Sequence, residues 1–168
     1  MCILSIPMKH LILIRHAKSS WEYDVIDHER PLNNRGINDA SLVSNALKEL
    51  DFKIGSVICS DARRTAQTAD FFIANLNIIP EIVEYSHELY DFDGRSLTTV
   101  VKNCDDAIKN LMVFGHNHAI TSFVNNYGSQ YIDNVPTCGV TIMEFDISSW
   151  SDLKKGETIQ TIFPRDLK

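Results

Sequence analysis

Short, mostly apolar runs alternate along the chain with longer stretches whose apolar residues recur at helical spacing. The runs at 11–14, 54–59 and 111–114 are typical of strands buried on both faces of a sheet. Each run is followed by a stretch with apolar positions three and four residues apart, which predicts a helix. A shorter strand is expected at 82–85 and a further helix at 97–107.

The pattern changes near the end of the chain. Two runs, 140–147 and 158–163, have the character of strands, and the polar stretch 148–156 separates them, which predicts an antiparallel hairpin. Strand–helix alternation that ends in strands predicts an α/β fold, a three-layer sandwich with a mostly parallel central sheet flanked by helices. The chain has 168 residues and shows no linker or repeat, so we expect a single domain over 8–168.

Charge and the first residues narrow the class of protein. The net charge of −6 argues against a general nucleic-acid surface, because such binding rests on neutralising phosphates, but it permits a local anion pocket. Residues 1–7 are apolar but lack the basic residues and length of a secretory signal, so we expect a short leader that need not belong to the fold, with Met8 as an alternative start. No stretch approaches a membrane span, and the four scattered cysteines form no C-x-x-C pair, so a cytoplasmic protein is expected.

Basic residues stand where three predicted strands end: Arg15 and His16 after the first, Arg64 after the second, and His116 after the third. Carboxyl ends of parallel strands meet at one edge of a sheet, so these residues can converge. Arginine offers a charged fork that suits phosphate, and a neutral, well-held histidine can attack phosphorus. Alone, each has an ordinary explanation, such as a solvated arginine or a hydrogen-bonded core histidine. Together they indicate a site for a phosphoryl group.

Five segments in this order resemble the histidine phosphatase superfamily, and within it the small SixA-like phosphohistidine phosphatases. They lie at 13–21, 30–36, 60–69, 115–117 and 136–137. Each segment alone is a weak signal, but the five together are specific and cover nearly the whole chain after the leader. The resemblance implies a phosphoglycerate mutase-like fold and a phosphatase.

The resemblance also implies roles for individual residues. His16 would be the nucleophile that accepts the phosphoryl group, and Arg15, Arg64 and His116 would form the phosphate pocket. Arg64 matches the family arginine better than Arg63, which we expect to face solvent.

Other positions match less directly. Ser19 stands where relatives contact the phosphate or its surroundings, whereas Arg30 and Arg35 are expected to have structural roles. Ala17 replaces the hallmark glycine of the family. His118 stands where many relatives have proline, and we interpret it as a residue at the start of a helix.

The proton donor has no comparable motif. Larger family members carry a glutamate in a loop after the third strand, and Glu88 is its nearest counterpart here. Asp91, Glu22 and Asp24 are alternatives from loops expected on the same rim. A phosphohistidine substrate lessens the need for a proton donor, because its N–P bond is labile.

No metal ion or other cofactor is implied by the resemblance, because the arginines and His116 would supply the positive charge. Sequence spacing identifies no ligand set among His28, His87 and His118. The long polar loop 18–33 is nonetheless expected to be functional, since loops of this length in compact domains rarely serve only as connections.

The sequence thus predicts a phosphatase with a histidine nucleophile and a phosphohistidine enzyme intermediate, acting on phosphohistidine in a protein. The alternatives are a small-molecule phosphomonoesterase or phosphoglycerate-mutase-like enzyme and, less favoured, a phosphate-binding module without catalysis. The expected partner is a phosphorylated protein or a small phosphate ester, with no nucleic acid and no membrane. The oligomeric state is left open.

Overall fold

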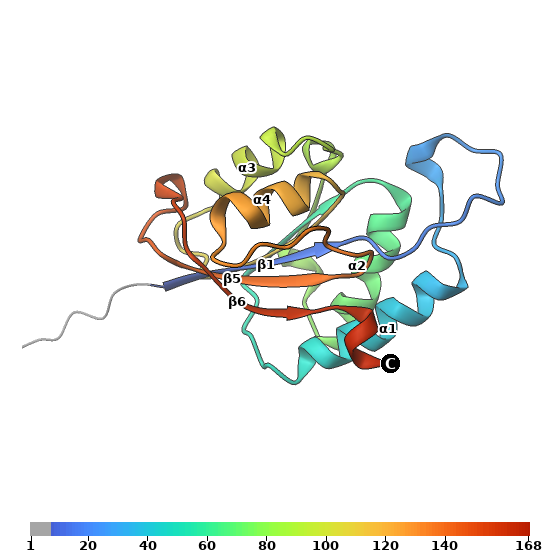
Figure 1. The fold of residues 1–168 in the computed structure, drawn as a ribbon, viewed down its shortest axis with the longest axis horizontal. Helices are drawn as coiled ribbons and strands as arrows, with labels where there is room; N and C mark the ends of the chain where they lie inside the picture. Colours follow the sequence, from blue (N-terminus) through green and yellow to red (C-terminus); the bar gives the residue numbers. More distant parts are fainter. Residues whose placement is uncertain (1–7) are drawn as a thin grey trace, which may run out of the picture.

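A single sheet organises the computed structural model, which describes residues 8–168 (Figure 1). The expected leader, 1–7, lies outside the described residues. In this part of the chain six strands pair in the order β3-β2-β4-β1-β5-β6. Their bounds are β1 Met8–Arg15, β2 Ser56–Ser60, β3 Val83–Ser86, β4 Asn110–Gly115, β5 Val140–Asp146 and β6 Glu157–Ile162.

The sheet is mostly parallel, as expected from the strand–helix alternation. Strands β3, β2, β4 and β1 pair in parallel, whereas β5 runs antiparallel to both β1 and β6. The predicted terminal hairpin is confirmed as β5 and β6. Strand β1 therefore lies inside the sheet, with its carboxyl end beside that of β4.

Helices cover both faces of the sheet and complete a three-layer α/β sandwich (Figure 1). Their bounds are α1 Asn34–Lys48, α2 Arg63–Asn75, α3 Arg95–Lys102 and α4 Ala119–Tyr127. Alternate residues of β1 point to opposite faces. Leu11 and Leu13 join a core cluster with residues of α3 and α4. Ile12 and Ile14 join a second cluster with residues of α1 and α2.

The helix expected at 97–107 is shorter and begins earlier, as α3. The Asp91 carboxylate accepts hydrogen bonds from the backbone N–H groups of Gly94 and Leu97, which starts the helix before the first apolar position. Beyond Lys102 the chain turns, and the side chain of Asp105 accepts the N–H of Ala107. Such local side-chain bonds compete with continued helix.

None of the helices in 8–168 has both the length and the apolar character that crossing a bilayer would require.

Candidate active site

The two histidines of the site lie side by side because their strands are neighbours. Arg15 pairs with Gly115 in the parallel β1–β4 ladder. The backbone N–H of His16 donates to the carbonyl of Gly115 at 3.1 Å, and the carbonyl of His16 accepts from Cys138 at 3.0 Å. The imidazole rings of His16 and His116 stand 5.2 Å apart, centroid to centroid. The carboxyl ends of β1 and β4 thus lie together, as expected.

The His16 ring is held in one tautomer. Its Nδ1 donates to the carbonyl oxygen of Ala17 at 2.7 Å, which leaves the lone pair on Nε2. The Nε of Arg64 lies 3.4 Å from that Nε2. Burial, together with the charges of Arg64 and Arg15, lowers the pKa of His16 to about 3. His16 is therefore neutral near pH 7, and Nε2 carries its lone pair.

Arg64 is buried in the first turn of α2, whereas the adjacent Arg63 is exposed, as expected. The guanidinium of Arg64 donates to Asp27 twice, from Nη1 to the backbone carbonyl at 2.7 Å and from Nη2 to the carboxylate at 3.0 Å. Partial burial acts to raise the pKa of Asp27, but hydrogen bonds from Tyr90 and Arg64 outweigh it and lower the pKa to about 2. An ionised Asp27 thus orients Arg64 beside His16.

His116 contacts the same arginine from β4. Its Nε2 lies 2.8 Å from Ser60 Oγ at the end of β2, and its Nδ1 lies 3.5 Å from Nη2 of Arg64. An arginine only donates, so we assign the ring proton to Nε2 and the bond to Ser60 as its donation. Burial, His16 and Arg64 lower the pKa of His116 to about 2, so the ring is neutral.

Arg15 brings a second guanidinium with an unused donor. Its Nη1 donates to the carbonyl of Val135 at 2.8 Å, but its buried Nε has no hydrogen-bond partner among the described residues. Burial and the nearby charge of Arg64 lower the pKa of Arg15. Two guanidinium cations whose charges lie this close together favour the binding of an anion beside them.

Ser19 lies in the long loop and is already engaged. Its hydroxyl accepts a hydrogen bond from Nη1 of Arg30 at 2.7 Å, and Ser19 also forms an isolated bridge with Leu32. Arg30 in turn donates from Nε to Asp27 at 3.1 Å and stacks over the ring of Trp21, 3.6 Å from its centroid. These contacts give Arg30 a structural position, and they connect Ser19 to the site through Asp27.

The structure does not bring Glu88 to the histidines. Its exposed side chain lines a groove that also includes Val83 and Val100, at the β3 edge of the sheet. Among the alternative donors, Asp91 caps α3, while Glu22 and Asp24 are exposed on the loop.

Sequence reasoning did not single out Asp27 and Tyr90, which contact Arg64 and His116. The hydroxyl of Tyr90 donates to the carboxylate of Asp27, and its ring packs edge-on against His116 with centroids 5.3 Å apart. Both residues lie in loops without periodicity, so only their proximity to the matched segments hinted at a role. Tyr90 lies two residues from Glu88, in the loop where a catalytic group was expected.

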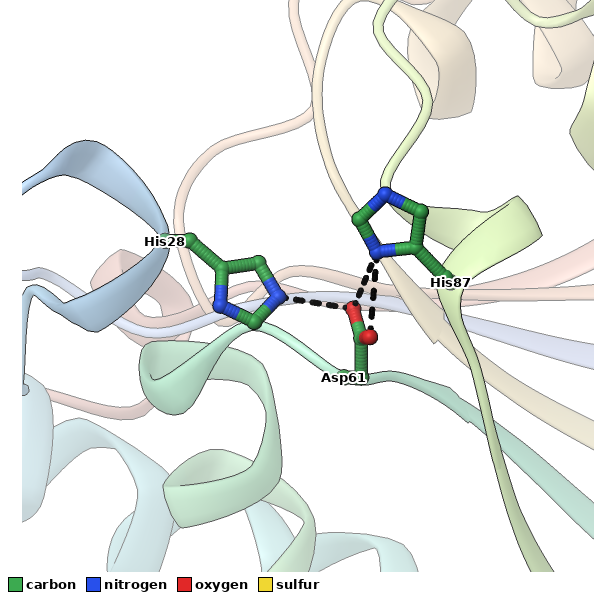
Figure 2. A group of neighbouring side chains, drawn as sticks. All are labelled: His28, Asp61 and His87. Atoms are coloured by element: carbon green, nitrogen blue, oxygen red, sulfur yellow. Dashed lines mark hydrogen bonds and ion pairs between the residues drawn. The ribbon is translucent and has the colours of Figure 1, made fainter.

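A cluster of His28, Asp61 and His87 lies beside this pocket. Spacing indicated no ligand set among the outlying histidines, but His28 and His87 both contact the carboxylate of Asp61 (Figure 2). Their separation of 59 residues hid the cluster. His118 remains exposed at the position before α4, as expected for a helix-start residue.

Sequence relatives extend over most of the chain. An uncharacterised chloroplastic protein of Arabidopsis thaliana is 29% identical over 157 residues, which cover 86% of this chain and 70% of the relative. An uncharacterised protein of Mycobacterium tuberculosis is 26% identical over 153 residues, covering 85% of this chain and 93% of the relative.

Solved structures share the fold. The protein histidine phosphatase SixA in complex with tungstate superposes with a TM-score of 0.77 at 21% identity, covering 95% of this chain and 99% of that one. Phosphoglycerate mutase from Bacillus anthracis superposes with a TM-score of 0.62 at 14% identity, covering 86% and 94% of the two chains. These likenesses establish a phosphoglycerate mutase-like fold.

The family model for the histidine phosphatase superfamily (branch 1) matches residues 11–108, a span that includes Arg15, His16 and Arg64. A match to this family supports a phosphatase activity. The chain belongs to the histidine phosphatase superfamily.

Proposed function

We propose that this protein is a protein phosphohistidine phosphatase in which His16 accepts the phosphoryl group. One observation carries the proposal: the buried, neutral ring of His16 holds its Nδ1–H on the Ala17 carbonyl and presents Nε2 beside Arg64. A neutral imidazole with one oriented lone pair is the form that attacks phosphorus.

The reaction has two steps. First, Nε2 of His16 forms a bond to phosphorus in line with the breaking P–N bond. The substrate ring leaves as a neutral imidazole, with a proton that its other ring nitrogen has already taken from solvent. Water then attacks phosphorus, the Nε2–P bond breaks, and inorganic phosphate departs, with the proton of the water passing to phosphate or solvent. The leaving imidazole is a far weaker base than an alkoxide, so protonation by a residue such as Glu88 matters less than for an ester.

The positive charge comes from the two arginines. Arg15 and Arg64 both lie close enough to His16 for their charges to lower its pKa, so both guanidinium groups can stabilise a phosphoryl group held at that ring. In the free protein His116 is neutral and adds no charge. A bound dianion would favour its protonated form and turn it into an additional donor. The similar SixA structure holds tungstate, a tetrahedral dianion with the shape of phosphate.

Exposed apolar side chains on the loop 18–33 favour a protein substrate over a small ester. Trp21, Tyr23 and Ile26 are 76%, 58% and 71% exposed. They belong to the same loop as Asp27, which holds Arg64. Exposed aromatic and aliphatic side chains are typical of protein interfaces, whereas binding a small ester does not require them.

The test is phosphate release from a phosphohistidine-bearing protein, compared with a phosphoserine peptide and with p-nitrophenyl phosphate. Wild type is expected to release phosphate from phosphohistidine at least tenfold faster, and His16→Ala is expected to release none. Brief incubation with labelled substrate should leave acid-labile, alkali-stable phosphate on wild type only.

The controls distinguish the alternatives. Turnover of small esters with no preference for phosphohistidine would replace this proposal with a small-molecule phosphomonoesterase, and migration of phosphate within a substrate would indicate a mutase. Stoichiometric phosphate binding without turnover of any substrate would indicate a binding module.

A further inference from the structure

Two histidines from distant segments meet on one carboxylate next to the phosphate pocket (Figure 2). Nε2 of His28 lies 2.8 Å from Oδ1 of Asp61. Nδ1 of His87 lies 3.1 Å and 3.0 Å from the two oxygens of the same carboxylate. His28 comes from the long loop, Asp61 from the β2–α2 junction and His87 from the 3₁₀ turn after β3.

The donor set suits a transition-metal ion. Imidazole nitrogen and carboxylate oxygen are the ligands that Zn²⁺ takes in sites with three protein ligands and one water. The three ligand atoms all lie within 4.8 Å of one another. In a tetrahedral zinc site adjacent ligand atoms are about 3.3 Å apart, so small side-chain rotations would bring these atoms to metal distance.

A further contact of His28 strengthens the assignment. Its Nδ1 lies 3.3 Å from a carboxylate oxygen of Glu29, so it can donate its proton there. In that tautomer the lone pair on Nε2 faces the carboxylate of Asp61, and two acceptors in contact need a cation between them. A proton serves this purpose in the hydrogen-bonded form. Histidine ligands of metals commonly donate their other N–H to a carboxylate in this way.

The cluster is open to solvent on one side. The side chain of His87 is 73% exposed, whereas those of His28 and Asp61 are 24% and 35% exposed. An ion can therefore reach the three ligands, and water can occupy the fourth position.

Each candidate ligand is next to a residue of the phosphate site. His28 follows Asp27, which holds Arg64, and Asp61 follows Ser60, the partner of His116. His87 precedes Tyr90 in the same short segment, and Tyr90 packs against both His28 and His116. An ion bound here would connect the three segments that contain Asp27, Ser60 and Tyr90.

We propose that His28, Asp61 and His87 bind one Zn²⁺-class divalent ion, which clamps the loop 18–33 to the rim of the phosphate pocket. The ion holds Asp27, and through it Arg64, in position without touching the phosphoryl group. The site does not depend on which phosphate compound is the substrate.

The experiment uses Co²⁺ alone as a probe, with full-length protein that carries no polyhistidine tag and has Cys2→Ser in every variant to remove a thiol outside the described residues. Wild type is expected to bind one Co²⁺ with the visible d–d absorption of a four- or five-coordinate site, and Zn²⁺ should displace it. His87→Ala and Asp61→Asn should weaken binding at least tenfold.

The matched control is His118→Ala, which removes another exposed histidine and should bind Co²⁺ like wild type. Equal binding by His87→Ala and wild type, or no saturable binding by wild type, would overturn the proposal. Replacement of His87 is expected to leave the fold intact because its side chain is largely exposed, and circular dichroism checks this directly. None of these readouts requires phosphatase turnover, so the result is independent of the proposed function.

Discussion

The molecule contains two groups of histidines that differ in what surrounds them. His16 and His116 are buried beside arginines, and their pKa values are lowered to about 3 and about 2. His28 is near the surface, where its hydrogen bond to Asp61 raises its pKa. Burial and cations thus favour neutral imidazoles, whereas a neighbouring carboxylate favours a bound cation. The same side chain is kept neutral in one place, as the proposed nucleophile must be, and is favoured as a cation in the other.

The largest expected effect comes from replacing His16, the proposed nucleophile in the buried histidine pair. His16→Ala is expected to reduce kcat/KM at least about 10³-fold, because no other group replaces the covalent step. Phosphate release under single-turnover conditions measures the effect. Substantial turnover by a folded His16→Ala protein would assign the nucleophile to another residue.

The second test separates the buried cation from its exposed neighbour. Arg64→Met is expected to reduce kcat/KM by roughly 10²-fold or more, because it removes the donor that we propose stabilises charge on the phosphoryl oxygens. Arg63→Met changes the same formal charge one residue away and should stay within about twofold of wild type, since that side chain is exposed. Similar losses in both variants would mean that general attraction of the anion dominates.

The third test concerns the protonation of His16. Its pKa in the folded protein, about 3, lies below the value near 6.5 of an unfolded chain, so the unfolded state binds the additional proton between these pH values. This contribution to stability is complete above pH 6.5 and is lost as the pH falls. Denaturant unfolding of wild type in phosphate-free buffer should therefore lose up to about 1.4 kcal/mol more per pH unit, between pH 6 and 4, than His16→Gln. Parallel profiles would show that folding does not lower the pKa of His16.

The smallest effect is expected at Tyr90, which contacts both His116 of the buried pair and His28 of the surface pair. Tyr90→Phe removes the hydroxyl that donates to Asp27 but keeps the ring beside His116. We expect a loss of about three- to tenfold in kcat/KM, the value of one partly exposed hydrogen bond to a charged group. A loss as large as that of Arg64→Met would indicate that the Tyr90 hydroxyl acts on the substrate itself.

Sequence reasoning was strongest where local pattern and topology agree. The apolar runs located the strands that end at or just before Arg15, His16 and His116. Because carboxyl ends of parallel strands meet at one edge of a sheet, these residues were then expected to lie together. Periodicity gave the wrong bounds for α3, because hydrogen bonds to Asp91 set the start of that helix. Glu88 was the candidate proton donor, but this side chain lines a groove at the β3 edge that includes neither His16 nor His116.

The sequence by itself determined the alternation of strands and helices, the terminal hairpin and the basic residues at the strand ends, because periodicity and strand direction are local properties. Only the tertiary structure decided that Asp27 holds Arg64, that Tyr90 joins them, and that His28 and His87 share Asp61. Those contacts join loops that have no repeating pattern. Their positions follow from packing across the rim of the sheet, to which residues distant in sequence contribute together.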